Sequence, residues 1–223
     1  MMHVHLIECD STQDVLKEQL RMTAGTTTVL VSCENQLKGR GRGDHLWSTM
    51  EGTLCFSIGL AAHHVPSFTA LEISVLIARF FELKGKKLGL KWPNDLFSSD
   101  GKKCAGILVQ NSADMMMTGI GLNLFSESVQ FGGVFDSAFP IDKESWSEEI
   151  AFFIIQNRYL KNSDLVSDWN ERCLHLHMNV QIEESGERKS GIFMGLGENG
   201  EALLQTENGI EHLYNGSLKI ISR

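Results

Sequence analysis

The chain has 223 residues, of which 42% are hydrophobic and 22% charged, a composition typical of a folded globular protein with one large domain, or one medium domain and a small appendage. Its formal net charge of −8 excludes a protein that binds DNA or RNA non-specifically over its surface, because that affinity comes largely from neutralised phosphates. Any site for anions must therefore be a local cluster of Lys and Arg.

The spacing of apolar residues predicts helices and short strands along most of the chain. Ser11 is a small polar residue before a helix-forming run and fits the N-cap of the first helix, where Asp14 suits the positive end of the helix dipole. The helices are expected at 14–20, 68–83, 144–160 and 164–174. The strands are expected at 26–33, 52–60, 88–92, 104–110 and 115–124.

Turn-forming pairs place the connections. Asp100-Gly101 stands between two apolar runs and predicts a hairpin. Residues 126–143 have no clear period and are expected to form a loop. From Met178 onward short β-type runs alternate with turns, including Asn199-Gly200 and Asn208-Gly209, which predicts a small antiparallel sheet or barrel. A module of about 45 residues is only marginally stable by itself, so we expect it to pack against the larger domain.

Five cysteines, an odd number without a C-x-x-C pair, argue against a disulfide framework or a zinc ribbon and fit a reducing compartment. Residues 1–10 lack the basic and apolar regions of a signal peptide. The apolar stretches fall short of the roughly 20 residues that cross a bilayer. We therefore expect a cytoplasmic protein without a membrane segment.

A basic glycine loop is the first candidate site. Gly39, Gly41 and Gly43 alternate with Arg40 and Arg42, after Lys38 and before Trp47. The glycines let backbone N–H groups approach a small ligand, and arginine can bind carboxylate or phosphate oxygens in a bidentate way. A solvated basic loop or a nucleic-acid-binding segment is an equally good interpretation of this loop alone. No Walker A loop occurs.

The second candidate is the run Lys91-Trp92-Pro93-Asn94-Asp95. Pro93 cannot donate to a sheet, so the chain must turn there and present Asn94 and Asp95 at the end of a strand. Asp95 could help to hold a magnesium ion or orient Lys91. The alternative, slightly favoured without context, is an Asx turn that only stabilises the corner.

Lys103 precedes an apolar strand that contains Gly106, and it is a candidate partner for a phosphate or acyl-phosphate oxygen. A lysine that merely extends from a hairpin into water would explain it as well.

Gly121 and Asn123 belong to a lone G-x-G run, which is more often a close backbone approach in a strand. Paired histidines lack a third ligand nearby in sequence, so we expect no structural metal.

Together these four motifs resemble those of biotin protein ligases, in the same order and at similar spacing. The resemblance extends from about residue 10 to the C-terminus. It implies an α/β catalytic domain with a mixed sheet flanked by helices at residues 1–176, and a small SH3-like β-barrel at 177–223. It also implies that biotin and magnesium-ATP form biotinyl-5′-adenylate, from which a lysine of a biotin carboxyl carrier protein, a subunit of acetyl-CoA carboxylase, is acylated.

The resemblance assigns roles residue by residue. Catalytic roles are implied for Arg40, Arg42 and Lys103. Biotin contacts are implied for Ser11, Thr12, Gln13, Gln36, Gly39, Arg40, Gly41, Arg42, Lys103 and Gly106. Contacts with ATP or the adenylate are implied for Trp47, Lys91, Asn94, Asp95, Gly121 and Asn123, with Asp95 as the expected ligand of Mg²⁺.

The chain departs from the family pattern in places. Gln13 replaces a frequent Asn, Asp44 stands where the family is usually basic, and Gln110 replaces a frequent acid. The chain begins almost at the catalytic domain, which leads us to expect no direct DNA binding. A homodimer is an open alternative. The rival interpretations are a lipoate or octanoate ligase or transferase, and a catalytically inactive protein that binds biotin or nucleic acid.

Overall fold

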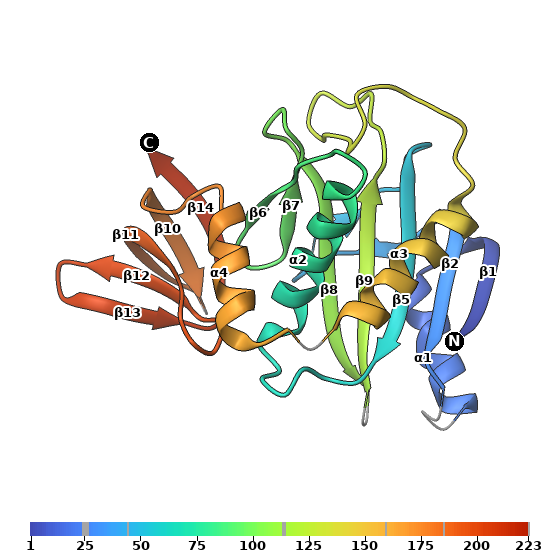
Figure 1. The fold of residues 1–223 in the computed structure, drawn as a ribbon, viewed down its shortest axis with the longest axis horizontal. Helices are drawn as coiled ribbons and strands as arrows, with labels where there is room; N and C mark the ends of the chain where they lie inside the picture. The colour runs from blue at the N-terminus through green and yellow to red at the C-terminus, as the bar shows by residue number, and fades with distance from the viewer. Residues whose placement is uncertain (24–26, 44, 113–114, 159, 185, 223) are drawn as a thin grey trace.

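A mixed sheet of seven strands lies at the centre of the fold (Figure 1), in a computed structural model that describes residues 1–23, 27–43, 45–112, 115–158, 160–184 and 186–222. The strand order is β1-β2-β5-β9-β8-β7-β6, in which β1 and β2 are parallel and the other neighbours antiparallel. The strands are β1 (Met2–Cys9), β2 (Val29–Gln36), β5 (Thr53–Leu60), β6 (Gly89–Lys91), β7 (Asp95–Phe97), β8 (Lys103–Ser112) and β9 (Met115–Asn123).

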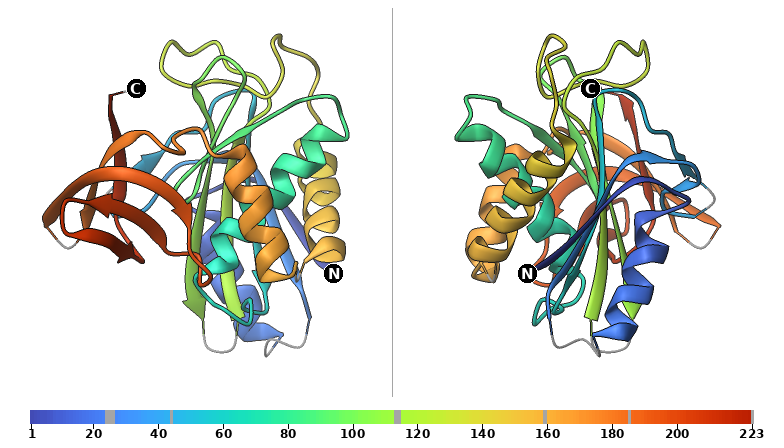
Figure 2. Two further views of the ribbon diagram at one scale, coloured as in Figure 1. Left: turned by 60° about the vertical axis from the view of Figure 1, so that its left-hand side comes forward. Right: turned by 90° about the vertical axis from the view of Figure 1, so that its right-hand side faces the viewer.

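Helices cover both faces of this sheet (Figure 2). On one face, α1 (Thr12–Met22) packs Leu16 and Leu20 against residues of β2 and β9 in a small apolar cluster. The opposite face is covered by α2 (Phe68–Glu82), α3 (Lys143–Asn157) and α4 (Asn162–Arg172). Because α2 is buried almost all round, it forms the centre of the main core, and each such buried Leu, Ile or Phe contributes roughly 1.5–3 kcal/mol.

A second sheet follows α4 and comprises, in the described residues, five antiparallel strands in the order β13-β12-β11-β10-β14. The strands are β10 (Asn179–Glu184), β11 (Glu187–Leu196), β12 (Ala202–Thr206), β13 (Gly209–Leu213) and β14 (Ser217–Ser222). Gly200 ends the turn before β12 and Gly209 begins β13 directly after the next turn; their φ angles of +79° and +115° lie in the region that favours glycine. Phe193 and Leu218 belong to the same apolar cluster as Leu90 of the central sheet, so one core joins the two sheets.

The predicted helices, the hairpin at Asp100-Gly101 and the loop at 126–143 are confirmed, with helix ends shifted by a few residues. The helix α1 follows Ser11, but the Ser11 side chain makes no capping hydrogen bond. Residue 26, where the first predicted strand begins, lies outside the described residues. The mixed α/β class is confirmed, whereas closure of the second sheet into an SH3-like barrel and the boundary at 176/177 stay predictions.

Strand β1 was not predicted, nor was the two-stranded ribbon of β3 (Gly39–Arg40) and β4 (Leu46–Trp47). Strand β7 was predicted only as the apolar run before the hairpin, without bounds of its own. The signal for β1 is the alternation of Val4 and Leu6, which pack on the small apolar cluster, with His3 and His5, which hydrogen-bond Ser32. Strands of two or three residues carry too few side chains to show a period. No described helix has the length and apolar character needed to span a membrane.

Candidate functional site

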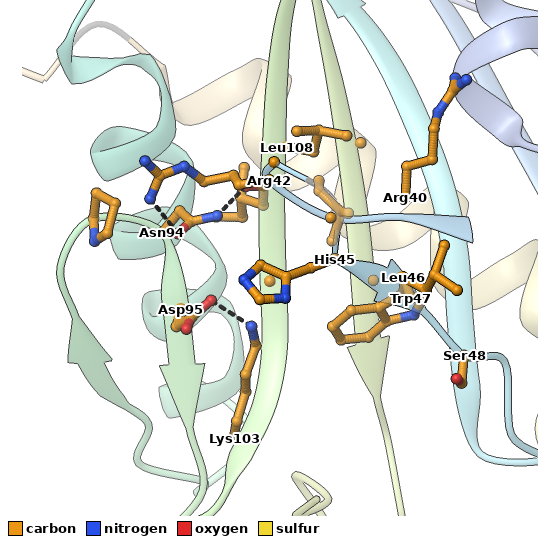
Figure 3. A pocket seen from close by; sticks show the side chains of 18 of the residues that line it. Arg40, Arg42, His45, Leu46, Trp47, Ser48, Asn94, Asp95, Lys103 and Leu108 are labelled. Carbon is orange, nitrogen blue, oxygen red and sulfur yellow. Dashed lines mark hydrogen bonds and ion pairs between the residues drawn. The ribbon is translucent and has the colours of Figure 1, made fainter. Parts of the chain in front are cut away.

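A cavity of about 580 Å³ opens between the glycine–arginine loop (residues 38–47, of which Asp44 lies outside the described residues), strands β8 and β9, and the turn before β14 (Figure 3). It brings together residues that are far apart in the chain. The candidate residues that line it are Ser11, Thr12, Gln13, Gln36, Arg40, Gly41, Arg42, Trp47, Lys91, Asn94, Asp95, Lys103, Gly106, Gly121 and Asn123.

Gly39 is the candidate that does not line the cavity. It pairs with Trp47 across the β3–β4 ribbon, and a Cβ atom at this position would lie 2.3 Å from the Trp47 carbonyl oxygen. Only glycine therefore allows the two short strands to approach this closely. The structural contribution of Gly39 is to close the ribbon that carries Arg40 and Trp47.

The cations of the site are held in different ways. Arg40 Nη2 lies 2.6 Å from Asp14 Oδ1 on α1, and Lys103 Nζ lies 2.6 Å from Asp95 Oδ1. Arg42 instead donates from Nη1 to the carbonyl oxygen of Gly216 at 2.9 Å. Figure 3 shows Arg40 directed toward α1, whereas Arg42 reaches the corner that carries Asn94.

Burial affects the two basic side chains nearest this corner. It lowers the pKa of Arg42, while the negative charge of Asp95 opposes the shift. It also lowers the pKa of Lys91, where Asp95 opposes the shift and Lys103 adds to it. Desolvated cations interact more strongly with an incoming anion than cations in water do, because the effective dielectric constant is smaller. The site is therefore suited to phosphate or carboxylate groups.

Trp47 forms part of the cavity wall over the central sheet. A Cβ atom at Gly121 would lie 2.2 Å from Trp47 Cε2, and one at Gly106 would lie 3.3 Å from Trp47 Cζ3. The indole thus packs against strand positions that carry no side chain. Lys103 Nζ lies 5.8 Å from the centre of the same ring, within the range of a cation–π contact.

A network of polar side chains forms the end of the cavity near α1. Thr12 donates from its backbone N–H and from Oγ1 to Gln36 Oε1, at 2.9 and 3.1 Å, and Thr12 Oγ1 is 2.8 Å from Ser57 Oγ. Gln13 Nε2 donates to the carbonyl oxygens of Leu108 at 3.0 Å and Met117 at 3.4 Å. These contacts fix hydroxyl and amide groups in positions where they can also meet a polar ligand.

Two of the asparagines stabilise the cavity wall. Asn94 Nδ2 donates to the carbonyl oxygen of Ile107 at 2.6 Å, and the Ile107 N–H donates to the Asn94 carbonyl oxygen at 3.0 Å, which joins the corner to β8. Asn123 accepts from Thr53 Oγ1 at 2.8 Å and donates to the carbonyl oxygen of Gly132 at 3.3 Å. Both side chains line the cavity and also donate hydrogen bonds to backbone carbonyl oxygens, which holds the neighbouring segments in place.

Sequence reasoning missed several residues of the wall. His45 and Leu46 lie in the same loop as the predicted arginines, so proximity could have suggested them. The second sheet contributes Glu183, Gly216, Ser217 and Leu218, for which the sequence holds no motif. Gly43, Trp92 and Pro93 belong to the candidate motifs but were given no role of their own. The remaining residues are Ser48, Met50, Ile107, Leu108, Gly119, Ile120 and Phe131.

A metal site made of protein ligands alone is absent from the part of the chain that the structure describes, where no three His, Cys, Asp or Glu residues cluster suitably. Asp95 and Glu183 are the described carboxylates that line the cavity. Mg²⁺ usually binds through one or two carboxylates together with substrate phosphates. The donor set therefore fits a magnesium ion that arrives with a nucleotide, and Asp95 as its ligand stays a prediction.

Comparison with known proteins matches residues 6–123 to the model of the biotin/lipoate A/B protein ligase family. The bifunctional ligase/repressor BirA of Bacillus spizizenii is 25% identical over 99% of this chain and 75% of its own length. The biotin–[acetyl-CoA-carboxylase] ligase of Mycobacterium tuberculosis is 27% identical over 79% of this chain and 73% of its own length.

A solved structure of the biotin protein ligase from Aquifex aeolicus, in complex with biotin and ATP, is 26% identical and superposes with a TM-score of 0.78, covering 98% of this chain and 99% of that one. The match of the family model covers residues 6–123, more than half of the chain, and includes the glycine–arginine loop, Lys91–Asp95 and Lys103. The chain belongs to the biotin/lipoate A/B protein ligase family.

Proposed function

We propose that the protein is an ATP-dependent biotin protein ligase, which forms biotinyl-5′-adenylate and transfers biotin to a lysine of a biotin carboxyl carrier protein. The observation that carries the proposal is the single cavity that unites the glycine–arginine loop, the Lys91–Asp95 corner and Lys103. The similarity to ligases named for biotin favours biotin over lipoate, both of which the family includes.

In the proposed first step, a carboxylate oxygen of biotin attacks the α-phosphorus of ATP. The bond between this phosphorus and the bridging oxygen to the β-phosphate breaks, and pyrophosphate leaves with the electron pair. Two anions must meet, so their repulsion and desolvation oppose the reaction unless fixed cations lie beside them. Arg42, Lys91 and Lys103 would supply those charges, and Arg40 would do so after leaving Asp14.

The two ends of the cavity differ in chemistry, and this difference supports the orientation of the substrates. Thr12 and Gln36 offer hydroxyl and amide groups that suit the ureido ring of biotin. Trp47 offers an aromatic face, which suits a purine base, and lies beside Lys103. The carboxylate of biotin and the α-phosphate would then meet near Lys103. Asp95 would help to hold the Mg²⁺ that accompanies ATP, which would neutralise part of the phosphate charge.

The glycine–arginine loop would protect the adenylate from water. A mixed anhydride hydrolyses readily, so a wall that excludes solvent preserves it for transfer. In the proposed second step, the neutral amine of the carrier lysine attacks the acyl carbon, the bond to the phosphate oxygen breaks, and AMP leaves. We further propose that the protein acts in the cytoplasm and that the second sheet is an SH3-like domain spanning residues 177–223.

The decisive experiment supplies ATP and Mg²⁺ with biotin or lipoate, measures pyrophosphate release, and then follows labelled biotin onto a purified carrier domain. We expect release with biotin and label on one carrier lysine. Release with lipoate alone would contradict the choice of substrate. Binding of biotin without any pyrophosphate release would instead identify a binding protein that lacks ligase activity.

A further inference from the structure

The contact between Arg42 and Gly216 joins the glycine–arginine loop to the second sheet. Arg42 Nη1 donates to the Gly216 carbonyl oxygen at 2.9 Å and approaches Asn94 Oδ1 at 3.5 Å. Gly216 stands in the turn between β13 and β14, which is 174 residues away in sequence. The first two residues of β14, Ser217 and Leu218, also line the cavity.

Arg42 differs from the other cations of its loop in the kind of oxygen it binds. Lys38 pairs with Asp10 and Arg40 with Asp14, whereas Arg42 forms no ion pair among the residues that the structure describes. A neutral carbonyl oxygen fixes the direction of the guanidinium without cancelling its charge. The positive charge of Arg42 therefore stays available to an anionic substrate while its position is already set.

The backbone at Gly216 is shaped for this contact. Its φ of +130° lies in the region that favours glycine, and an added Cβ atom would lie 2.7 Å from the carbonyl oxygen of Glu183 on β10. A side chain at this position would force the turn away from β10. The direction of the Gly216 carbonyl thus depends on the glycine.

We propose that Gly216 is a positioning residue, whose carbonyl oxygen holds Arg42 and the glycine–arginine loop over the cavity before substrates bind. The second sheet then takes part in adenylate formation through this turn. The part of the proposal that concerns catalysis rests on the proposed ligase function, whereas the part that concerns the position of the loop does not.

The experiment compares Gly216→Ala with Gly209→Ala. Gly209 is the first residue of β13, directly after the neighbouring turn of the same sheet, and has a φ of +115°, but a Cβ atom there would meet nothing within 4 Å. Both substitutions introduce similar backbone strain, so they form a matched pair in which only Gly216→Ala displaces the contact with Arg42. The thermal midpoints of both variants report the cost to folding.

The first measurement is the rate at which trypsin cleaves after Arg40 and Arg42. This assay does not depend on any ligase activity of the protein itself. Cleavage reports the open fraction of the loop, and loss of one hydrogen bond to a charged group should raise it by about ten-fold in Gly216→Ala. We expect the Gly209→Ala rate to match that of the unchanged protein. Equal rates for the two variants would overturn the proposal.

A second variant guards against misfolding of Gly216→Ala. Arg42→Met keeps a long side chain but removes the donor, so cleavage after Arg40 should rise about as much as in Gly216→Ala, and the double variant should show no further increase. Two results would contradict a shared contact. One is a rate of tryptic cleavage after Arg40 that Arg42→Met leaves unchanged. The other is a double variant in which the effects of the two substitutions on this rate add.

Kinetics supply the test of the catalytic part. A loss of folded enzyme lowers kcat alone, whereas a misplaced Arg42 should raise the KM for ATP in Gly216→Ala and leave it unchanged in Gly209→Ala. An unchanged KM would show that the contact orders the loop without positioning Arg42 for catalysis, and would overturn that part. If the unchanged protein released no pyrophosphate, the ligase proposal would fail while the cleavage rates still decided the contact.

Discussion

Lys103 and Asp95 form an ion pair of 2.6 Å between adjacent strands β8 and β7, inside the cavity (Figure 3). The pair is partly open to solvent, with side-chain exposures of 31% and 20%. The carboxylate therefore holds the ammonium group in place without sealing it off. A substrate phosphate or carboxylate can share or replace Asp95 as the partner of Lys103. Substitution of Lys103 is therefore a direct test of whether the cavity binds such an anion.

Substitution of Lys103 by alanine should lower the rate of adenylate formation by roughly 10²–10³-fold, the loss usual for removal of one group that stabilises charge in a transition state. Pyrophosphate release measures it, and circular dichroism checks that the fold is kept. Lys102→Ala is the matched control, because Lys102 does not line the cavity and lies 3.8 Å from Asp100. Equal activity of the two variants would show that the role of Lys103 is misassigned.

Substitution of Gly121 by alanine should displace Trp47, because the new Cβ atom would lie 2.2 Å from Cε2 of the indole. The loop can yield more easily than the central strand β9, so we expect a small loss of stability and a clear rise in the KM for ATP. Gly106→Ala is the graded comparison, since its Cβ atom would approach the indole only to 3.3 Å. A larger effect from Gly106→Ala would contradict this account of the Trp47 position.

Long amphipathic segments were predictable from sequence, and two-residue strands were not. The helix α2 is long enough for the helical spacing of Leu71, Val75 and Phe80 to be seen, although it is buried almost all round. The ribbon formed by Gly39–Arg40 and Leu46–Trp47 depends instead on tertiary contact with the sheet. Strand β1 had a period of two, but its histidines interrupt the apolar pattern because they bind Ser32 inside the protein.

The glycine–arginine loop, the Lys91–Asp95 corner and Lys103 were predictable from their own chemistry. Thr12, Gln13 and Gln36 were predictable only from the family resemblance, and the structure brings them to the same cavity. The contribution of Gly216 was not predictable, because a backbone carbonyl oxygen leaves no trace in residue type. The pairing of Arg40 with Asp14 was hidden for a related reason. Charge complementarity between distant residues appears only when α1 and the loop are placed side by side.

Removal of the buried carboxylate Glu72 should lower the free energy of unfolding by about 3–5 kcal/mol, because it breaks a buried ion pair by deleting its anion. Arg158 Nε lies 3.1 Å from Glu72 Oε2, with exposures of 3% and 0%. Glu72→Ala is compared with Glu149→Ala, which breaks an exposed pair with Lys84 and should cost less than about 1 kcal/mol. Urea unfolding measures both, and similar losses would contradict the assigned difference.

Stability should fall in mild acid because of His175, which lies fully buried between Trp169 and Phe193 at the junction of the two sheets. Burial, reinforced by the charge of Lys91, lowers its pKa from 6.5 to about 4. Between these two values the unfolded chain binds a proton that the folded protein does not. The free energy of unfolding therefore falls as pH decreases from 6.5 toward 4, by at most roughly 1.4 kcal/mol per pH unit from this group.

His175→Phe keeps an aromatic ring in contact with Phe193 but cannot take up a proton. His3 and His63, whose pKa values burial also lowers, are present in both proteins, so the comparison isolates His175. We expect urea unfolding at pH 5 and pH 7.5 to show a smaller difference in stability for the variant than for the unchanged protein. The same difference in both would mean that His175 stays uncharged in the unfolded chain as well, or is protonated in the fold, and either result would remove this histidine from the acid sensitivity.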